Sequence, residues 1–233
     1  MKYSVQKLKR QIRLAKSVAR SFGKPKIFGI GKNKTGTTSL AAAMRELGFS
    51  VGNQREAELL VHDWAKRDFK QIIRYCRTAE FFQDVPFSYP YTFIAMDQAF
   101  KGSRFILTVR DSPEQWYNSL VRFHSKIFGK DGRVPTKEDL QQATYIYKGR
   151  PWEMRILRGI TPDNDPYNKE ILIGDYERHN ETVIDYFRHR PDDLLVLNVA
   201  EEVAFQKLAG FLGKKSNRTE FPWRNRTDTV VDS

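Results

Sequence analysis

Short apolar runs alternate along the chain with longer segments in which apolar residues recur every three or four positions. Short runs bounded by turn residues are typical of buried strands, and the longer periodic segments are typical of helices. The pattern predicts strands at 26–30, 49–51, 80–84, 104–109 and 194–199. It predicts helices at 39–47, 56–76, 170–189 and 201–212. Alternating strands and helices favour an α/β fold, with a mostly parallel sheet of about five strands and helices on both faces.

The turn after the first predicted strand has the composition of an anion-binding loop. Residues 31–39 are Gly-Lys-Asn-Lys-Thr-Gly-Thr-Thr-Ser, and the predicted helix that follows ends at Gly48. Between a strand and a helix, the backbone N–H groups of such a turn and the positive end of the helix dipole point toward the same place. The sequence therefore predicts a site for a phosphate or a related oxyanion.

Two common phosphate loops do not account for this turn. A dinucleotide fingerprint needs glycine where Lys34 stands, and a nucleotide-kinase loop needs lysine where Thr37 stands. The lysine of this chain lies inside the loop instead. Residues 34–40, Lys-Thr-Gly-Thr-Thr-Ser-Leu, resemble the K-[ST]-G-T-[TS] loop of the sulfotransferase family.

The resemblance has consequences for fold and chemistry. It implies a P-loop-NTPase-like α/β/α fold of three layers. It also implies an enzyme that moves the sulfuryl group of 3′-phosphoadenosine 5′-phosphosulfate (PAPS) to an acceptor hydroxyl or amine and leaves 3′-phosphoadenosine 5′-phosphate (PAP). The residues that it assigns to the 5′-phosphosulfate are Lys34, Thr35, Gly36, Thr37, Thr38 and Ser39, with Lys34 also catalytic. In this mechanism the lysine supplies the cation that a metal supplies in kinases, so no metal is expected.

A second resemblance follows the strand at 104–109. This strand leads into Arg110, and the next predicted helix carries Ser119. In the family, an arginine and a serine in these places bind the 3′-phosphate of PAPS, and the planar guanidinium suits phosphate oxygens. The interval between the two residues is one longer than the usual family form, with Ser112 as the added residue. A salt bridge at the strand end is the alternative role for Arg110.

A third resemblance concerns the general base. The strand at 80–84 ends in Asp84, before a Val-Pro pair, where the cytosolic sulfotransferases have a catalytic histidine. A carboxylate with a reference pKa near 4 is a weak base at neutral pH unless burial raises that pKa. Asp84 is therefore either the base or a residue that orients the acceptor or the loop. His62 and His124 are the reserve candidates for the base.

The C-terminal segment resembles the family once more. Residues 221–227, Phe-Pro-Trp-Arg-Asn-Arg-Thr, match an F-P-x-x-N-x-[ST] ending of a microbial and plant-type branch. The resemblance makes Arg224 and Arg226 candidates for the 3′-phosphate or the adenosine side of PAPS. Solvated charges on a loose tail are the alternative.

The net charge of +12 belongs to one end of the chain. Residues 1–45 hold 12 of the 40 Lys and Arg and no Asp or Glu, so the remaining residues hold 28 charges of each sign. A nucleic-acid surface needs basic residues spread over a folded face, so no nucleic-acid partner is expected. Residues 1–25 form a basic arm. Within it, residues 2–22 have helical amphipathic spacing, which predicts weak contact with an anionic membrane, with a helix docked on the domain or a frayed basic tail as the alternatives.

Residues 123–168 have the least regular pattern and are rich in Gly, Pro, Arg and aromatic residues. An insert before the last strand is suited to be a lid or an acceptor wall. Its aromatic side chains would stack on an acceptor ring or form a small core of their own. Residues 26–233 are thus predicted to be one α/β domain with an insert.

The remaining expectations concern the cellular compartment, the class of acceptor and the rival functions. Cys76 is the only cysteine, which indicates a reducing compartment, and we expect a cytoplasmic protein, with membrane-peripheral contact if the arm binds lipid. The expected acceptor is a small molecule, a sugar or a lipid. The rival functions are a nucleotide-dependent kinase or NTPase with a displaced loop lysine, and a non-catalytic nucleotide-binding protein of the same fold.

Overall fold

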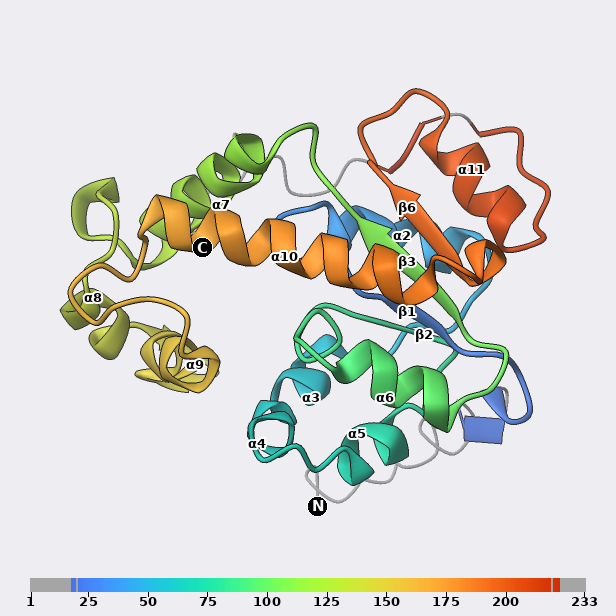
Figure 1. Ribbon diagram of the computed structural model, residues 1–233, viewed down its shortest axis with the longest axis horizontal. Helices are drawn as coiled ribbons and strands as arrows, with labels where there is room; N and C mark the ends of the chain where they lie inside the picture. Colours follow the sequence, from blue (N-terminus) through green and yellow to red (C-terminus); the bar gives the residue numbers. More distant parts are fainter. Residues whose placement is uncertain (1–17, 20, 219, 223–233) are drawn as a thin grey trace, which may run out of the picture.

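A parallel sheet lies at the centre of the protein (Figure 1). The computed structural model describes residues 18, 19, 21–218 and 220–222. Within them the sheet consists, in the spatial order β2-β1-β3-β6, of β2 (Phe81–Gln83), β1 (Ile27–Gly29), β3 (Arg104–Thr108) and β6 (Leu194–Leu197). Each neighbouring pair is parallel. The predicted α/β fold is confirmed.

Helices cover both faces of the sheet because successive side chains of a strand point to opposite faces. Phe28 and Phe105 belong to an apolar core on one face, and Ile27 and Ile106 belong to a second core on the other. The helices over the first face include α6 (Thr92–Ala99) and α10 (Lys169–Phe187), and those over the second are α2 (Thr37–Glu46) and α11 (Ala204–Phe211). The three layers follow from this two-sided burial.

Two predicted elements differ from the structure. The strand at 49–51 is reduced to a single parallel bridge between Val51 and Phe81, so the sheet has four strands in the described part. The prediction of a single helix at 56–76 was wrong. The segment consists of three helices, which are α3 (Gln54–Glu58), α4 (Val61–Ala65) and α5 (Lys70–Tyr75). Arg67 interrupts it with a left-handed backbone (φ 58°), and the Asp68 carboxylate accepts from the N–H of Lys70 to begin the next turn.

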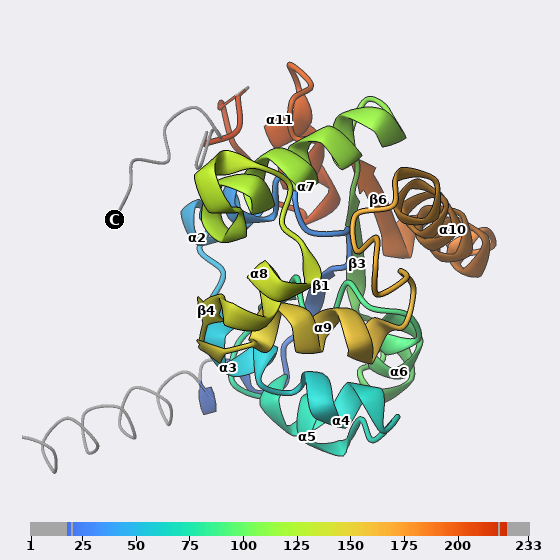
Figure 2. The ribbon, with the colours of Figure 1, turned by 90° about the vertical axis from the view of Figure 1, so that its left-hand side faces the viewer.

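The insert forms a lobe at one side of the sheet (Figure 2). It follows α7 (Pro113–Phe128) and consists of η1 (Lys130–Gly132), α8 (Lys137–Gln142), β4 (Thr144–Tyr145), β5 (Tyr147–Lys148) and α9 (Arg150–Arg158). Leu140, Trp152 and Tyr167 of this region join Trp116 and Tyr176 in a third apolar cluster. The insert therefore packs with α7 and α10 around a small core that is separate from the two cores of the sheet.

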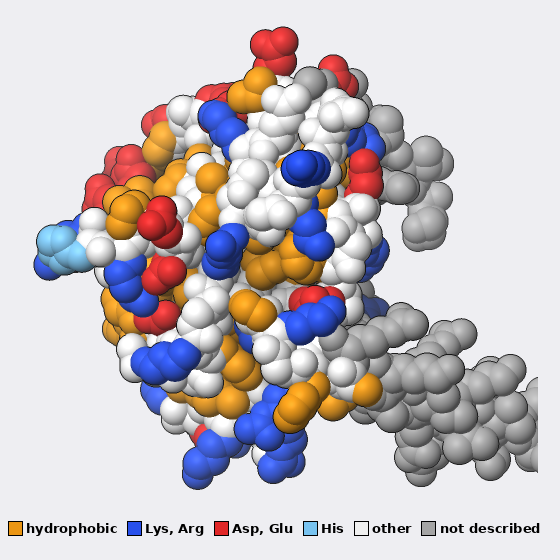
Figure 3. Space-filling model, turned by 90° about the vertical axis from the view of Figure 1, so that its right-hand side faces the viewer, with side chains coloured by type: hydrophobic (Ala, Val, Ile, Leu, Met, Phe, Trp, Pro, Cys, Tyr) orange, Lys and Arg blue, Asp and Glu red, His pale blue; other side chains and the backbone are white. Residues whose placement is uncertain are grey.

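The surface and the chain ends complete the picture. On the face shown in Figure 3, Lys and Arg side chains are interspersed with acidic and apolar ones. Among the described residues, none of the helices has the length and apolar character needed to cross a membrane. Nearly all of the predicted arm at 2–22 lies outside the described residues, as do Arg224 and Arg226.

Candidate active site

A cavity of about 1280 Å³ lies beyond the carboxyl ends of the central strands. One wall, called here the loop wall, is built by residues 33–39 of the anion-binding loop and by residues 110–119. The opposite wall, called the insert wall, is built by Glu58 and by residues 123–167 of the end of α7 and the insert. Open parallel sheets bind ligands at this edge. The volume exceeds the usual range for a single ligand, so the cavity has room for two.

Glycines let the loop approach the sheet and turn into α2. A Cβ on Gly31 would lie 2.2 Å from Thr108 Oγ1 and 2.4 Å from the Thr108 carbonyl oxygen, so only glycine fits there. Gly36 has a left-handed backbone (φ 96°) that ordinary side chains disfavour. Thr35 Oγ1 donates to the Lys32 carbonyl (2.6 Å) and lies 2.5 Å from Thr108 Oγ1, so its side chain anchors the loop rather than lining the cavity.

The N-terminus of α2 faces the cavity without a capping side chain. Gly36 is its N-cap and offers no side-chain acceptor, whereas the N-termini of α7 and α10 are capped by Ser112 and Asn168. The first N–H groups of a helix have no acceptor within the helix and attract anions. Thr37, Thr38 and the rest of this turn thus present to the cavity the polar groups that suit a phosphate or a related oxyanion.

The Lys34 ammonium is held at the cavity by contacts from α7 and the end of β3. Arg110 Nε donates to the Lys34 carbonyl (2.7 Å), and Trp116 Nε1 donates to the Asn33 carbonyl (2.9 Å), which fixes the loop. Lys34 Nζ lies 3.5 Å from the centre of the Phe123 ring. Burial, with Arg110 nearby, lowers the pKa of Lys34 to about 8, against the opposing effect of Asp84.

Asp84 lies directly after β2 and lines the same cavity as Lys34, close enough for their charges to interact. Its backbone is left-handed (φ 58°), which Asp tolerates better than most residues. One carboxylate oxygen accepts from the Val85 N–H (2.9 Å), and the other lies 3.4 Å from Thr37 Oγ1. Burial, with the negative charge of Glu58 nearby, raises the pKa of Asp84 to about 6. A carboxylate with this pKa is a better base near neutral pH than an exposed one.

The arginine and the serine predicted to bind the 3′-phosphate lie on the loop wall. Arg110 is half-buried, and both it and Ser119 line the cavity. Ser112, the added residue between them, accepts from the N–H of Gln115 (3.1 Å) and caps α7. The longer interval is thus absorbed at the start of the helix.

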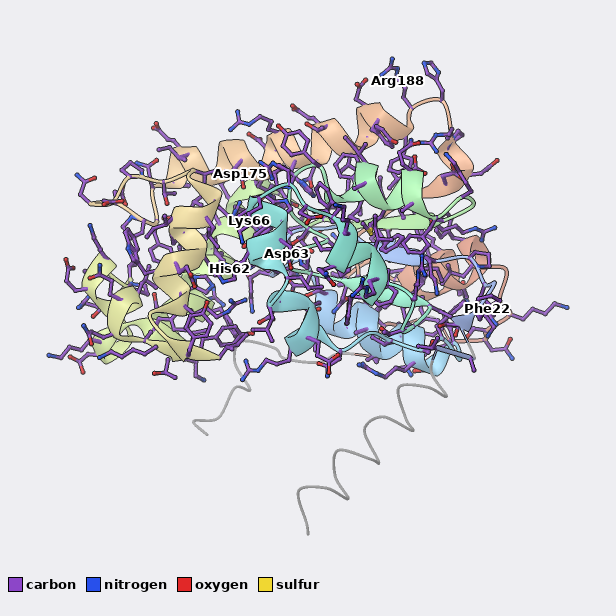
Figure 4. The ribbon with its side chains drawn as sticks, turned by 90° about the horizontal axis from the view of Figure 1, so that it is seen from below. Phe22, His62, Asp63, Lys66, Asp175 and Arg188 are labelled. Carbon is purple, nitrogen blue, oxygen red and sulfur yellow. The ribbon has the colours of Figure 1, made fainter. Side chains whose placement is uncertain are left out.

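The reserve histidines lie in different places. His124 lines the cavity, and its Nδ1 lies 2.8 Å from the Tyr167 hydroxyl. Burial, together with the charges of Arg155 and Lys34, lowers the pKa of His124 well below the usual value, so its ring is neutral at pH 7. His62 does not line the cavity: it is on α4 and pairs with Glu153 on the outside of the insert (3.7 Å) (Figure 4).

The insert wall contains charged residues that the sequence pattern did not single out. Glu58 receives hydrogen bonds from the Tyr145 hydroxyl on its carboxylate (3.0 Å) and from Arg150 on its carbonyl (2.7 Å). Arg158 of α9 and Lys32 both pair with Asp175 of α10, which is labelled in Figure 4, and the Lys32 distance is 2.8 Å. The sequence did contain one signal for these charged residues, because the arginines of α9 recur at helical spacing.

Comparison with known proteins agrees with this geometry. The family model described as "Sulfotransferase domain" matches residues 26–230, most of the chain. The chain therefore belongs to the sulfotransferase family, which is a family of sulfuryl-transferring enzymes. A search of the curated proteins found no match. In the part of the chain that the structure describes, no cluster of three or more His, Cys, Asp and Glu side chains is arranged to hold a metal ion.

Proposed function

We propose that the protein transfers the sulfuryl group of PAPS to an acceptor hydroxyl or amine. The observation that carries this proposal is the convergence of Lys34, Asp84, Arg110 and Ser119, which come from four parts of the chain, on one cavity. Family membership supports sulfuryl transfer in general. The donor and the residue roles are inferred from the site.

The loop wall would hold the nucleotide. The uncapped N-terminus of α2 and the hydroxyls of Thr37 and Thr38 fit the 5′-phosphosulfate. Arg110 and Ser119, further along the same wall, fit the 3′-phosphate. This second phosphate site is the feature that would select PAPS over ATP. A kinase with a displaced lysine would have no use for it.

The transfer step would need a cation beside the leaving phosphate oxygen and a base beside the acceptor hydroxyl or amine. The bond between sulfur and the bridging phosphate oxygen breaks as the acceptor oxygen or nitrogen forms its bond to sulfur. Lys34 would stabilise the negative charge that develops on the leaving phosphate oxygen, which is an electrostatic contribution of the kind that dominates many enzymes. Asp84 would accept the acceptor proton, and its raised pKa supports this role over a purely orienting one.

The nucleotide is tested by calorimetry with PAP and, separately, with ATP plus Mg²⁺. Tight PAP binding and negligible ATP binding are expected, because only PAP fills both phosphate sites. Tighter ATP binding would favour the kinase or NTPase function instead.

Transfer is tested with labelled PAPS and a panel of hydroxyl and amine compounds. Lys34→Ala is expected to lower kcat roughly hundred- to thousandfold while the fold is kept, since it removes one electrostatic contact to the leaving oxygen. Lys148→Gln, which removes an exposed charge of the insert that does not line the cavity, is the control. Intact turnover in Lys34→Ala would contradict the mechanism, and PAP binding without transfer to any compound would favour a non-catalytic binding protein.

A further inference from the structure

One face of α9 lines the insert wall. Arg150, Met154, Arg155 and Arg158 all contribute to the cavity, and their spacing brings them to the same side of the helix. Arg150 and Arg155 are buried, with exposed fractions of 1% and 9%. Three guanidinium groups are thus presented to the cavity from one short helix.

These arginines differ in their partners. Arg150 lies 4.0 Å from the Glu58 carboxylate, and Arg158 pairs with Asp175, which it shares with Lys32. Arg155 forms no ion pair with an aspartate or glutamate among the residues that the structure describes. Its guanidinium lies 4.4 Å from the centre of the Tyr167 ring and donates to the hydroxyl of this ring, which also lies 2.8 Å from His124 Nδ1. Counting Lys32, four cations therefore share two carboxylates in this region.

A buried charge without an anionic partner is costly, and arginine cannot relieve the cost by losing its proton at neutral pH. Stacking on Tyr167 compensates only part of it. A planar guanidinium is also the group best suited to bind a carboxylate or phosphate with two hydrogen bonds. Apolar side chains line the cavity near it, and these are Ile127, Phe128, Leu140 and Met154.

From this arrangement we propose that the acceptor carries an anionic group, a carboxylate or a phosphate, which binds to Arg155 and is separated by an apolar segment from the hydroxyl or amine that receives the sulfuryl group. The proposal rests on the proposed sulfotransferase function, and it narrows the acceptor from small molecules in general to acidic amphipathic ones. Arg155 belongs to the insert wall and not to the loop wall that would hold PAPS, which assigns the anion to the acceptor.

The test compares matched acids and amides. The probes are ω-hydroxy fatty acids of several chain lengths and 4-hydroxyphenylacetate, each beside its neutral amide. Each is titrated calorimetrically into the PAP-saturated protein and then assayed as an acceptor of label from PAPS. The wild-type protein is expected to bind at least one acid roughly ten- to hundredfold more tightly than its amide, as for one charge-assisted contact.

Two variants and a control distinguish the contribution of Arg155 to the acid preference from the contribution of overall charge. Arg155→Gln is expected to abolish the preference for the acid and to leave amide binding and PAP binding unchanged, and Lys148→Gln is expected to keep the preference. Arg155→Lys keeps a cation without the planar fork and is expected to keep only part of the preference; it also serves if Arg155→Gln does not fold.

The outcomes distinguish this inference from the proposed function. Equal binding of every acid and its amide by the wild-type protein, or a preference that persists in both Arg155 variants, would overturn the inference even if sulfuryl transfer occurs. Loss of PAP binding in Arg155→Lys would overturn it too, because Arg155 would then act on the donor. An acid preference that depends on Arg155 without any sulfuryl transfer would uphold the acidic ligand and refute the transferase function.

Discussion

The loop wall and the insert wall of the cavity are built in different ways. The loop wall is made mainly of backbone groups and short side chains from a few contiguous residues, held by hydrogen bonds from Arg110 and Trp116 to loop carbonyls. The insert wall is made of long charged and aromatic side chains whose partners are far away in the sequence, such as Arg150 with Glu58. A fixed anion, the nucleotide, suits the first kind of wall. A variable acceptor suits the second.

This difference between the two walls indicates how such an enzyme would continue to bind the same donor nucleotide while its acceptor specificity changes. A side chain at Gly31 would collide with Thr108, whereas the side chains of the insert wall are constrained by their charge partners. Asp84 stands between the two walls, and Phe123 bridges them through its contact with Lys34. Variants at these positions therefore test where the division lies.

The largest effect is expected at Asp84. Asp84→Asn should lower kcat/KM roughly hundred- to ten-thousandfold, because a general base is lost. In the wild-type protein kcat/KM should rise with pH through about 6, as Asp84 loses its proton, and fall above about 8, as Lys34 loses its own. The measurement is the pH profile of kcat/KM for both proteins.

The variant itself should lose the rise near pH 6 and keep the fall, moved below pH 8 because Asp84 no longer raises the pKa of Lys34. Glu58→Gln is the matched control for removal of a neighbouring carboxylate, and it should keep both limbs, with the rise moved to lower pH because Glu58 no longer raises the pKa of Asp84. A full lower limb in Asp84→Asn would show that another group, with His124 the nearest candidate, is the base.

A smaller effect is expected on the loop wall. Arg110→Gln should weaken PAP binding roughly ten- to hundredfold, since it removes a charged contact to phosphate and the hydrogen bond to the Lys34 carbonyl. Calorimetry with PAP measures the loss. Ser119→Ala, which removes a neutral hydroxyl, should cost less than tenfold. Equal affinities for PAP in Arg110→Gln and the wild-type protein would place the 3′-phosphate elsewhere.

The smallest effect is expected where the two walls meet. Phe123→Leu removes the ring whose centre lies 3.5 Å from Lys34 Nζ, and kcat should fall about two- to tenfold because the ammonium is held less firmly. Phe123→Tyr keeps the aromatic face and should stay near the wild-type rate. A steady-state assay with PAPS checks both, and a larger fall in Phe123→Leu than in Lys34→Ala would mean that the ring acts on the acceptor instead.

The sequence predicted much of the loop wall because its information is local. Residues 31–39, Arg110 and Asp84 each follow an apolar strand, and parallel strands bring their carboxyl ends to one edge. The prediction of one continuous helix at 56–76 was wrong, because the break within it does not depend on a local pattern. Its apolar periodicity was real, but the left-handed turn at Arg67 is set by packing and by the Asp68 side chain, which periodicity does not report.

By itself the sequence determined the α/β alternation, the glycine-bearing turn with its internal lysine, and the family to which the chain belongs. These depend on contiguous residues, whose backbone geometry and spacing act over one strand, one turn and one helix. Only the tertiary structure decided that Thr35 faces inward, that His124 rather than His62 lines the cavity, and that Arg155 alone among the arginines of α9 has no carboxylate partner in the described chain. Pairing and burial are settled by side chains from distant segments, and no local pattern records which of them meet.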